Sequence, residues 1–547
     1  MTNGGWLDSN TADGMRLTLA EEFSDIYVYN LRGNQRTAGE QSRKEGGKIF
    51  DAGSRATVAI TVLVKDPTHT GSSRIHYTDI GDYLTRRQKL DLIAAASDIT
   101  GLDAMDIAPN EHGDWLNQRR DDFPNFLPIG DKTATERIFV LSSAGLKTNR
   151  DAWVSGFSPA RVESNIKKMV KFYNAEVDRI GGSSSTPNMD PSQFSWDRAD
   201  RANLRRGRKY VLASDSLRRQ TYRPFTRQAV WFDRTLNNTV YQLERLFPSS
   251  TVSNHGFWLS APGCPAPFQT LLVEAIPDLV LGGAGNPGQF FARWRYEPVG
   301  MGAGEAMLSF DVADADDANV VDGYRRVDNV TDEALKKFRA AYGDRVTKDD
   351  IFDYCYGLLH SQDYREMYAA DLKKMLPRIP LVIDPWPYVK AGRELAKLHL
   401  DYETVEPYPL EGLDVQPSGA VAWEFYRVEK MAFAKQRDPE TKKLVADKST
   451  IKYNGRITVS GIPEDAYRYM LGSRSAVEWI MDRYQVKTDK ASGIVNDPND
   501  WSREVGDPRY ILDLLARIVT VSVETMKIVD ALPLLDILDG PDSSTRD

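Results

Sequence analysis

Arginine side chains are concentrated between residues 198 and 234. This window holds ten arginines and one lysine against three aspartates, and aromatic residues such as Tyr222 and Trp231 are interleaved with them. A planar guanidinium group can grip phosphates and can bind the edge of a guanine base through two parallel hydrogen bonds. The pattern therefore favours contact with nucleic acid over a solvated face held by ordinary ion pairs. We expect the contacts to come from Arg205, Arg206, Lys209, Arg218, Arg219, Arg223 and Arg227.

A second basic segment runs from Arg32 to Lys48. Glycines at positions 39, 46 and 47 indicate a loop with a permissive backbone. The segment adds four candidate contacts to those of the arginine window: Arg32, Arg36, Arg43 and Lys44.

Two other segments are similar to methyltransferase motifs, but neither fits its motif. The glycine turn from Asp278 to Gly288 is similar to a loop that cradles a nucleotide or S-adenosylmethionine, and such a loop should open a helix. The residues that follow it, QFFARWRYEP, predict a strand instead. Residues 384–388 (DPWPY) are similar to the Asp/Asn-Pro-Pro-Tyr loop that holds a target amine, but Trp386 interrupts the motif. We predict a structural turn before a helix there.

The sequence contains no pattern typical of a self-contained catalytic or metal centre. The six histidines lack metal-ligand spacing, Cys264 and Cys355 have no histidine close in sequence, and residues 314–317 lack the glycine and distal glutamate of a calcium loop. His360 and His399 are expected to be packing or capping residues. There is no Walker A motif, so any ATP-driven step would lie outside this chain. We therefore expect no catalytic residue, no metal and no cofactor bound by this chain alone.

The elements that must position these residues begin with a sheet. Apolar runs at residues 26–31 and 56–65 predict two buried strands, and an amphipathic helix is predicted at 11–23. This order is typical of the second half of an α/β sheet, so we expect a partial domain with one exposed sheet edge. The rest of the chain predicts a helix at 81–97, a strand at 138–143, a helix at 158–179, a β-rich region at 208–310, helices within 331–376 and at 390–399, a β-leaning stretch at 451–463, and helices at 464–484 and 508–529.

The amino-acid composition limits which classes of protein this chain can belong to. The 547 residues include 70 basic and 78 acidic side chains, for a net charge of −8, and 41% of them are hydrophobic. These values are typical of a soluble globular protein of about three or four folding units. No apolar run is long enough for a membrane span and the N-terminus does not resemble a signal peptide, so we expect a cytoplasmic protein without membrane partners. The acidic total alone would disfavour nucleic acid, but the positive charge is concentrated locally.

Several segments together resemble the C-terminal part of Type ISP restriction-modification enzymes. Four segments resemble the end of the family's methyltransferase domain: NGGWLDSNTADGMR (3–16), NLRGNQRTAGEQSRKEGGKIF (30–50), VAITVLVKDP (58–67) and IHYTDIGDYLTRRQKL (75–90). Three segments resemble the recognition region: HGDWLNQR (112–119), TNRDAW (148–153) and YRPFTRQAVWFD (222–233). LLHSQDYREMYAADLKKMLPRIP (358–380) resembles the helical spacer of that region. SAVEWIMDRYQVKTDKASGIVNDPNDW (475–501) resembles its closing segment. Their number and order make the resemblance specific.

The resemblance implies a fold of mixed class, α/β and α+β. A partial methyltransferase-type α/β sheet would be followed by a two-lobed mixed α+β target-recognition domain with a helical spacer. The expected units are residues 1–100 for the end of the methyltransferase domain, 101–320 for the first lobe, 321–400 for the spacer, and 401–547 for the second lobe and closing helices. The implied function is sequence-specific recognition of duplex DNA for adenine-N6 methylation and restriction.

The resemblance also implies that the chain is catalytically incomplete. The family's S-adenosylmethionine turn and its Asn-Pro-Pro-Tyr loop would both precede Asn3. The complete enzyme would use S-adenosylmethionine, and the chain's partners would be double-stranded DNA and an upstream chain carrying nuclease, ATPase and the first half of the methyltransferase. Two alternatives stay open: a stand-alone DNA-binding specificity subunit that recruits separate chains, and an inert truncated remnant.

Overall fold

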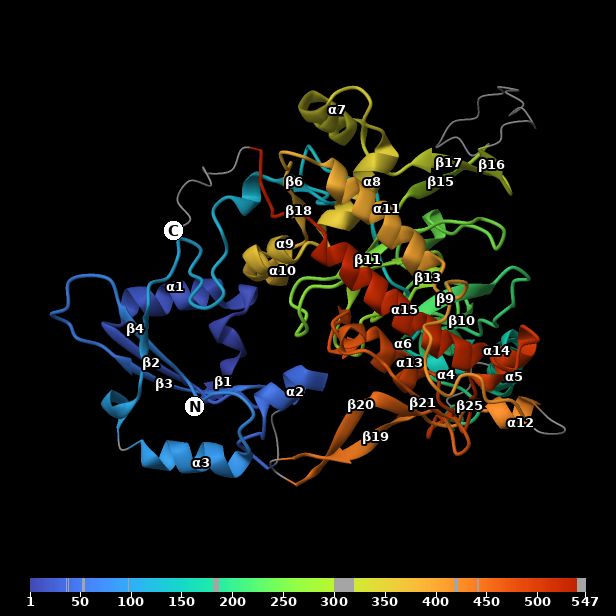
Figure 1. Ribbon diagram of the computed structural model, residues 1–547, viewed down its shortest axis with the longest axis horizontal. Helices are drawn as coiled ribbons and strands as arrows, with labels where there is room; N and C mark the ends of the chain where they lie inside the picture. The colour runs from blue at the N-terminus through green and yellow to red at the C-terminus, as the bar shows by residue number, and fades with distance from the viewer. Residues whose placement is uncertain are drawn as a thin grey trace.

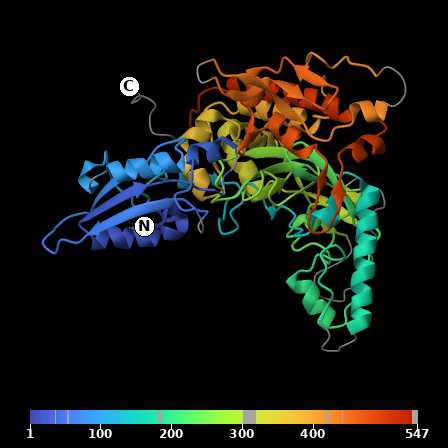
Figure 2. The ribbon, with the colours of Figure 1, turned by 90° about the horizontal axis from the view of Figure 1, so that it is seen from below.

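The structure is a computed structural model. It describes residues 1–35, 37, 39–51, 55–96, 98–180, 186–299, 319–417, 422–439 and 442–538. Within these ranges an N-terminal unit lies beside a larger body, and a long arm protrudes from the body (Figure 1, Figure 2). None of the helices in the described ranges is long and apolar enough to cross a membrane.

The N-terminal unit is a five-stranded sheet with helices on both faces. The strand order is β1 (Thr2–Asn3), β3 (Val58–Val64), β2 (Asp25–Asn30), β4 (Arg74–Asp79) and β5 (Met105–Ile107), and only β2 and β4 pair in parallel. Alternate residues of β2 face opposite sides, so Ile26 and Val28 pack towards α1 (Asp13–Glu22) and Tyr29 packs towards α3 (Arg86–Ala95). The short helix α2 (Gly39–Glu45) lies in the loop between β2 and β3.

The predicted strands and helices of this unit are confirmed. β1 pairs only with Val58 and Ala59 of β3, so the rest of β3 forms a sheet edge in the described chain, as expected. β5 lies beyond residue 100, where the sequence placed the end of the first unit.

The body contains several small sheets packed together. One has the order β13 (Ile276–Pro277), β9 (Leu217–Arg223), β10 (Thr226–Trp231), β8 (Ser155–Gly156), and another has the order β12 (Thr270–Val273), β11 (Gly256–Ser260), β14 (Gly288–Ala292), β7 (Ser143–Ala144). The remaining strands are β15 (Trp294–Pro298), β17 (Tyr324–Asp328) and β16 (Val320–Val321) in one sheet, β19 (Ala432–Arg437), β20 (Leu444–Lys452) and β21 (Thr458–Ser460) in another, and the pairs β6 (Leu127–Pro128) with β18 (Arg378–Ile379), β22 (Met470–Leu471) with β23 (Arg474–Ser475), and β24 (Lys487–Thr488) with β25 (Val495–Asn496).

Helices join these sheets into two large cores. The first core contains β-sheet residues such as Val230 and Trp258 together with the C-terminal helix α15 (Tyr510–Asp530), so the two predicted lobes share one interior. The second core surrounds α8 (Lys348–Leu358) and α11 (Trp386–Leu400). The other helices of the body are α4 (Asp151–Val154), α7 (Asp332–Tyr342), α9 (Gln362–Met367), α10 (Ala369–Lys374), α12 (Ala422–Tyr426), α13 (Ala476–Arg483) and α14 (Asn499–Glu504).

The arm consists of α5 (Pro159–Ile180) and α6 (Arg198–Arg205), which have a core of their own (Figure 2). Arg150 in the body donates to Asp200 of α6 across 2.7 Å, and both side chains are almost fully buried. Asp200 also accepts a hydrogen bond from Tyr210 at 2.8 Å. This buried pair fixes the arm to the body, because either charge alone would be costly to bury.

The mixed fold class is confirmed, and two local predictions are corrected. The predicted helix at 464–484 is α-helical only over α13, with a short 3-10 helix at Glu464–Tyr467, because the Gly472–Ser473 turn forms the β22–β23 hairpin and Ser475 caps the helix that follows. The strand predicted at 138–143 forms only the bridge at Phe139 and the start of β7. The helices predicted within 331–376 are confirmed as α7, α8, α9 and α10, and Gly343 has a φ of 91° at the first break.

Candidate nucleic-acid interface

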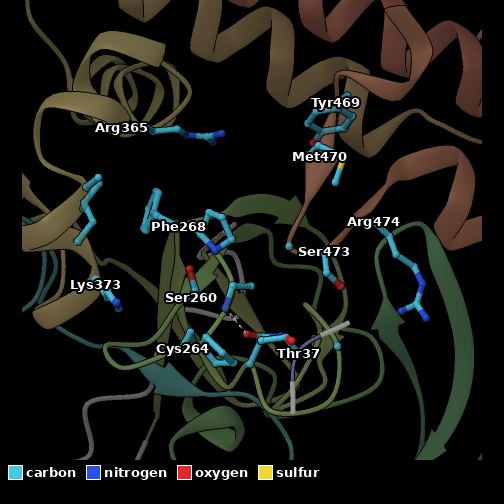
Figure 3. Close-up of a pocket in the computed structure, with 18 of the residues that line it drawn as sticks. Thr37, Ser260, Cys264, Phe268, Arg365, Lys373, Tyr469, Met470, Ser473 and Arg474 are labelled. Atoms are coloured by element: carbon cyan, nitrogen blue, oxygen red, sulfur yellow. Dashed lines mark hydrogen bonds between the residues drawn. The ribbon is translucent and has the colours of Figure 1, made fainter. Parts of the chain in front are cut away.

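A cleft of about 1240 Å³ opens between the N-terminal unit and the body. The N-terminal wall includes Gln35, Thr37 and Lys44 of the loop that carries α2. The opposite wall is formed by the turn at 260–268, by α9 and α10, and by the β22–β23 hairpin (Figure 3). Residues more than 400 positions apart in the sequence therefore face the same space.

The cleft is strongly basic although the chain is acidic. Its lining contains one acidic residue, Glu366, among the described residues. The basic residues that line it are Lys44, Arg55, Arg223, Arg365, Lys373, Arg468, Arg474 and Arg483. A concave surface with one sign of charge concentrates field lines and attracts a polyanion.

Half of these cations are already paired inside the protein. Arg468 binds Asp530 at 2.7 Å, and Arg223 binds Asp278 at 2.8 Å beneath the surface. Lys373 pairs with Asp8, and Arg483 pairs with Asp482. Within the described part of the chain, no carboxylate forms an ion pair with the other four, which are Lys44, Arg55, Arg365 and Arg474. These four are the charges available to a ligand.

A buried ion network holds the two walls together. Asp114, fully buried, binds Lys374 of α10 at 2.8 Å and Arg119 at 2.8 Å. Arg16 of α1 lies 3.5 Å from the same carboxylate and donates to the backbone of the N-terminal unit. These cations hold the pKa of Asp114 well below its usual range. The network therefore connects α1 of the N-terminal unit to α10 of the body and fixes the width of the cleft.

The glycine turn at 278–288 forms part of the cleft floor. Gly283 has a φ of 104°, and a Cβ atom on Gly288 would lie 2.0 Å from the Trp258 ring. Gly288 begins strand β14, which confirms the predicted strand. The glycines are therefore needed for close packing against aromatic side chains, and the turn does not present helix amides to a nucleotide. These residues do not fit an S-adenosylmethionine site.

Residues 384–388 form the predicted structural turn. Asp384 accepts a hydrogen bond from the Trp386 amide at 3.2 Å, and α11 begins at that residue. The Tyr388 hydroxyl donates to the Pro533 carbonyl at 3.1 Å and is buried. A tyrosine held in this way cannot stack on a base.

The predicted contact residues are distributed over four places. Lys44 and Arg223 line the cleft, whereas exposed Arg205, Arg206 and Lys209 lie on the arm. A second cavity, of about 650 Å³, is lined by Arg218, Arg219 and Arg227. Arg32 is held by Asp79 and Asp82, Arg43 lies in the last turn of α2, and Arg36 lies outside the described residues. DNA contact by these residues stays a prediction.

Ion pairing gives several of the predicted contacts a role in the fold. Arg227 binds Glu274 at 2.6 Å and also pairs with Glu403. Burial lowers the pKa of Arg227, but Tyr402, Glu403 and Glu274 raise it by more, so that the net change is upward. Arg223 stacks on Tyr222 with its Cζ atom 4.1 Å from the ring centre. The folded chain therefore does not bring the arginine window together as one surface.

The two histidines singled out in the sequence are packed inside the body, as predicted. His399 accepts or donates at both ring nitrogens, with Tyr356 at 2.6 Å and Thr525 at 2.9 Å. His360 contacts the Tyr356 carbonyl through Nδ1 at 2.9 Å. Burial lowers the pKa of both residues, that of His399 to about 3.

Sequence reasoning missed Arg365 and Arg474 as candidate contacts. Each is an isolated arginine in a segment predicted to be helical, so local charge density does not indicate that either one contacts a ligand. Only folding places both in the cleft. Arg474 lies over the Trp479 ring with its Cζ atom 5.0 Å from the centre.

The chain matches proteins of one family. Residues 137–514 match the family model of the Type ISP C-terminal specificity domain. Among solved structures, a nuclease-deletion mutant of the Type ISP restriction-modification enzyme LlaGI in complex with a DNA substrate mimic is 38% identical, with a TM-score of 0.80, over 98% of this chain and 39% of that one. The ATP-dependent Type ISP restriction-modification enzyme LlaBIII bound to DNA is 36% identical, with a TM-score of 0.80, over 98% of this chain and 32% of that one.

The DrdV–DNA complex is also similar, with 30% identity and a TM-score of 0.78 over 98% of this chain and 50% of that one. No curated protein matches the sequence. The chain thus spans half or less of the length of each of these structures. The family model covers well over half of the chain, and this protein belongs to the Type ISP restriction-modification family and carries its C-terminal specificity domain.

Proposed function

We propose that this chain recognises a specific sequence of duplex DNA for a Type ISP restriction-modification enzyme, and that the duplex lies in the cleft. The observation that carries the proposal is the charge of the cleft, with eight basic lining residues against Glu366 in a chain of net charge −8. The three similar solved structures are all complexes with DNA or a DNA mimic, which supports the same conclusion.

The cleft offers two kinds of contact. Lys44 and Arg55 on the N-terminal wall are exposed or half-buried cations suited to phosphates, which fix the register of a duplex without reading its sequence. The body wall presents Ser473, Arg474 and Arg365 (Figure 3). Polar side chains of this kind bind base edges. Affinity would come mainly from the first kind of contact and specificity from the second.

The first test is selection of duplexes by the purified chain. From a random duplex pool the chain should enrich one sequence, and the affinity for it should fall linearly with salt on logarithmic axes, with a slope of about −0.9 for each phosphate contact. Binding that is absent at about 50 mM salt, or that does not depend on salt, contradicts the proposal.

We infer further that recognition serves adenine-N6 methylation and restriction by a larger assembly. Neither the 278–288 turn nor the 384–388 segment fits a methyl-transfer site, because both are committed to packing. The cofactor S-adenosylmethionine, the catalytic loop, the nuclease and the ATPase would come from an upstream part or partner chain. The greater length of the similar structures supports this division.

This division of recognition and methyl transfer between two parts can be tested by mixing the chain with the product of the adjacent upstream gene. The chain alone should transfer no methyl group from labelled S-adenosylmethionine to its selected duplex. Adding the product of the adjacent upstream gene should give both stable association and transfer. Methylation by the chain alone, or association without transfer, would refute this part; the second outcome would favour a specificity subunit for separate enzymes.

A further inference from the structure

One arginine of the cleft is held in a single orientation. Arg365, on α9, donates from Nε to the carbonyl of Leu359 at 2.5 Å, just past the end of α8. Its Cζ atom lies 5.8 Å from the centre of the Phe268 ring. Figure 3 shows the side chain extending from its helix into the cavity. The carbonyl and the ring fix the plane of the guanidinium, and the two terminal nitrogens remain for a ligand.

The charge of Arg365 has no compensation inside the protein. Among the described residues no carboxylate forms an ion pair with it, in contrast to Arg468 and Lys373 in the same cleft. Burial lowers the pKa of Arg365 to about 10, so the group is still charged at neutral pH. Arg365 is half-buried, and a charge partly withdrawn from water without a partner carries a cost that a ligand with acceptor atoms reduces.

The neighbours of Arg365 leave further polar atoms without partners. Tyr469 Oη and His360 Nε2 are buried and have no hydrogen-bond partner among the described residues, and both side chains line the cleft. Because His360 Nδ1 faces the Tyr356 carbonyl, that nitrogen carries the proton and Nε2 presents a lone pair. Both atoms are closed to solvent, so the polar group at this end of the cleft that a ligand can reach is the guanidinium of Arg365.

A guanidinium held in one plane suits the flat edge of a base, whereas the exposed cations of the N-terminal wall suit phosphates. In the major groove a G·C pair presents the guanine O6 and N7 acceptors beside the cytosine N4 donor. The two terminal nitrogens of an arginine match the two guanine acceptors in a bidentate contact.

We propose that Arg365 is a specificity-determining residue that reads one guanine of the target sequence through O6 and N7. The inference rests on the proposed function, since it assumes that duplex DNA occupies the cleft. It goes further by separating one base-reading arginine from the cleft cations that bind phosphates.

The test is a base-by-base comparison of preference. For the wild-type chain and for Arg365→Lys, Arg365→Ala and Lys44→Ala, affinities are measured for the selected duplex and for every single base-pair replacement. Arg365→Lys keeps a positive charge but loses the planar fork, and both Arg365 variants should lose a preference of roughly 5- to 150-fold for guanine at one position only. Lys44→Ala should weaken all duplexes by the same factor and leave every preference unchanged.

The outcomes are distinguishable. Uniform weakening by Arg365→Ala would make this arginine a phosphate contact, and unchanged binding would remove it from the interface; either result overturns the inference. A wild-type chain that shows no base preference defeats the proposed function itself. Thermal unfolding of each variant is measured alongside, and Arg365→Lys provides the result if Arg365→Ala does not fold.

Discussion

At the scale of single residues, charged side chains in the segments that resemble the family form ion pairs inside the protein. Asp114 of HGDWLNQR anchors the network between the two walls, and Arg150 of TNRDAW binds Asp200 under the arm. Arg223 of YRPFTRQAVWFD is buried against Asp278. The sequence does not show that Lys374, Asp200 and Asp278, the partners of these three residues, lie 50 or more positions away. Arg223 was therefore interpreted as a DNA contact from local charge density.

His399 should make stability depend on pH. Its pKa of about 3 in the folded chain lies below the value of about 6.5 of a solvated histidine, so the unfolded state binds the proton first as the pH falls. Stability should fall from pH 6.5 downwards, by about 2 kcal/mol between pH 7 and pH 5 for this one group.

Chemical denaturation at pH 7 and pH 5 measures the effect. Other groups titrate in the same range, so the result is the difference between the wild type and His399→Gln, which keeps polar atoms near Tyr356 and Thr525. The wild type should lose more stability on acidification than the variant. Equal losses in the two proteins would show that His399 is not the group responsible.

At the scale of elements, local signals predicted most of the helices and strands, and the errors have local causes. The β22–β23 hairpin contains a Gly-Ser pair after the apolar residues Met470 and Leu471, and Ser475 with Glu478 forms a capping box, so both the turn and the later helix start were present in the sequence. The apolar periodicity of residues 464–484 outweighed these signals.

The network around Asp114 should be essential to the joining of the N-terminal unit and α10. Asp114→Ala leaves Arg16 and Lys374 buried without their carboxylate, so we expect a loss of about 3–5 kcal/mol in the free energy of unfolding. Asp121→Ala removes an exposed aspartate close by and should change stability by less than about 0.5 kcal/mol. Denaturant unfolding compares the two variants, and limited proteolysis should cut the first 100 residues faster in Asp114→Ala. Similar stabilities would mean that the walls are joined by other contacts.

At the scale of the whole molecule, the interface could not be predicted from the sequence. The charges of the cleft come from four parts of the chain that are far apart in sequence: the α2 loop, the end of β9, the α9–α10 segment, and residues 468–483 around the β22–β23 hairpin and α13. Local charge density indicated the arginine window, which the fold divides among the arm, the second cavity and the body interior. The net charge of −8 alone would disfavour a nucleic-acid ligand, but a total does not show where on the molecule the charges lie.

The location of the duplex is the central claim, and the salt dependence of DNA binding tests it most directly. Two phosphate-binding charges are removed from the cleft with Lys44→Ala/Arg55→Ala, and two exposed charges are removed from the arm with Arg205→Ala/Arg206→Ala. For the cleft variant we predict a salt slope that is smaller by about two and a weaker affinity. For the arm variant we predict a slope within about 0.5 of the wild type. A larger loss of slope in the arm variant than in the cleft variant would contradict the account and place the duplex on the arginine window.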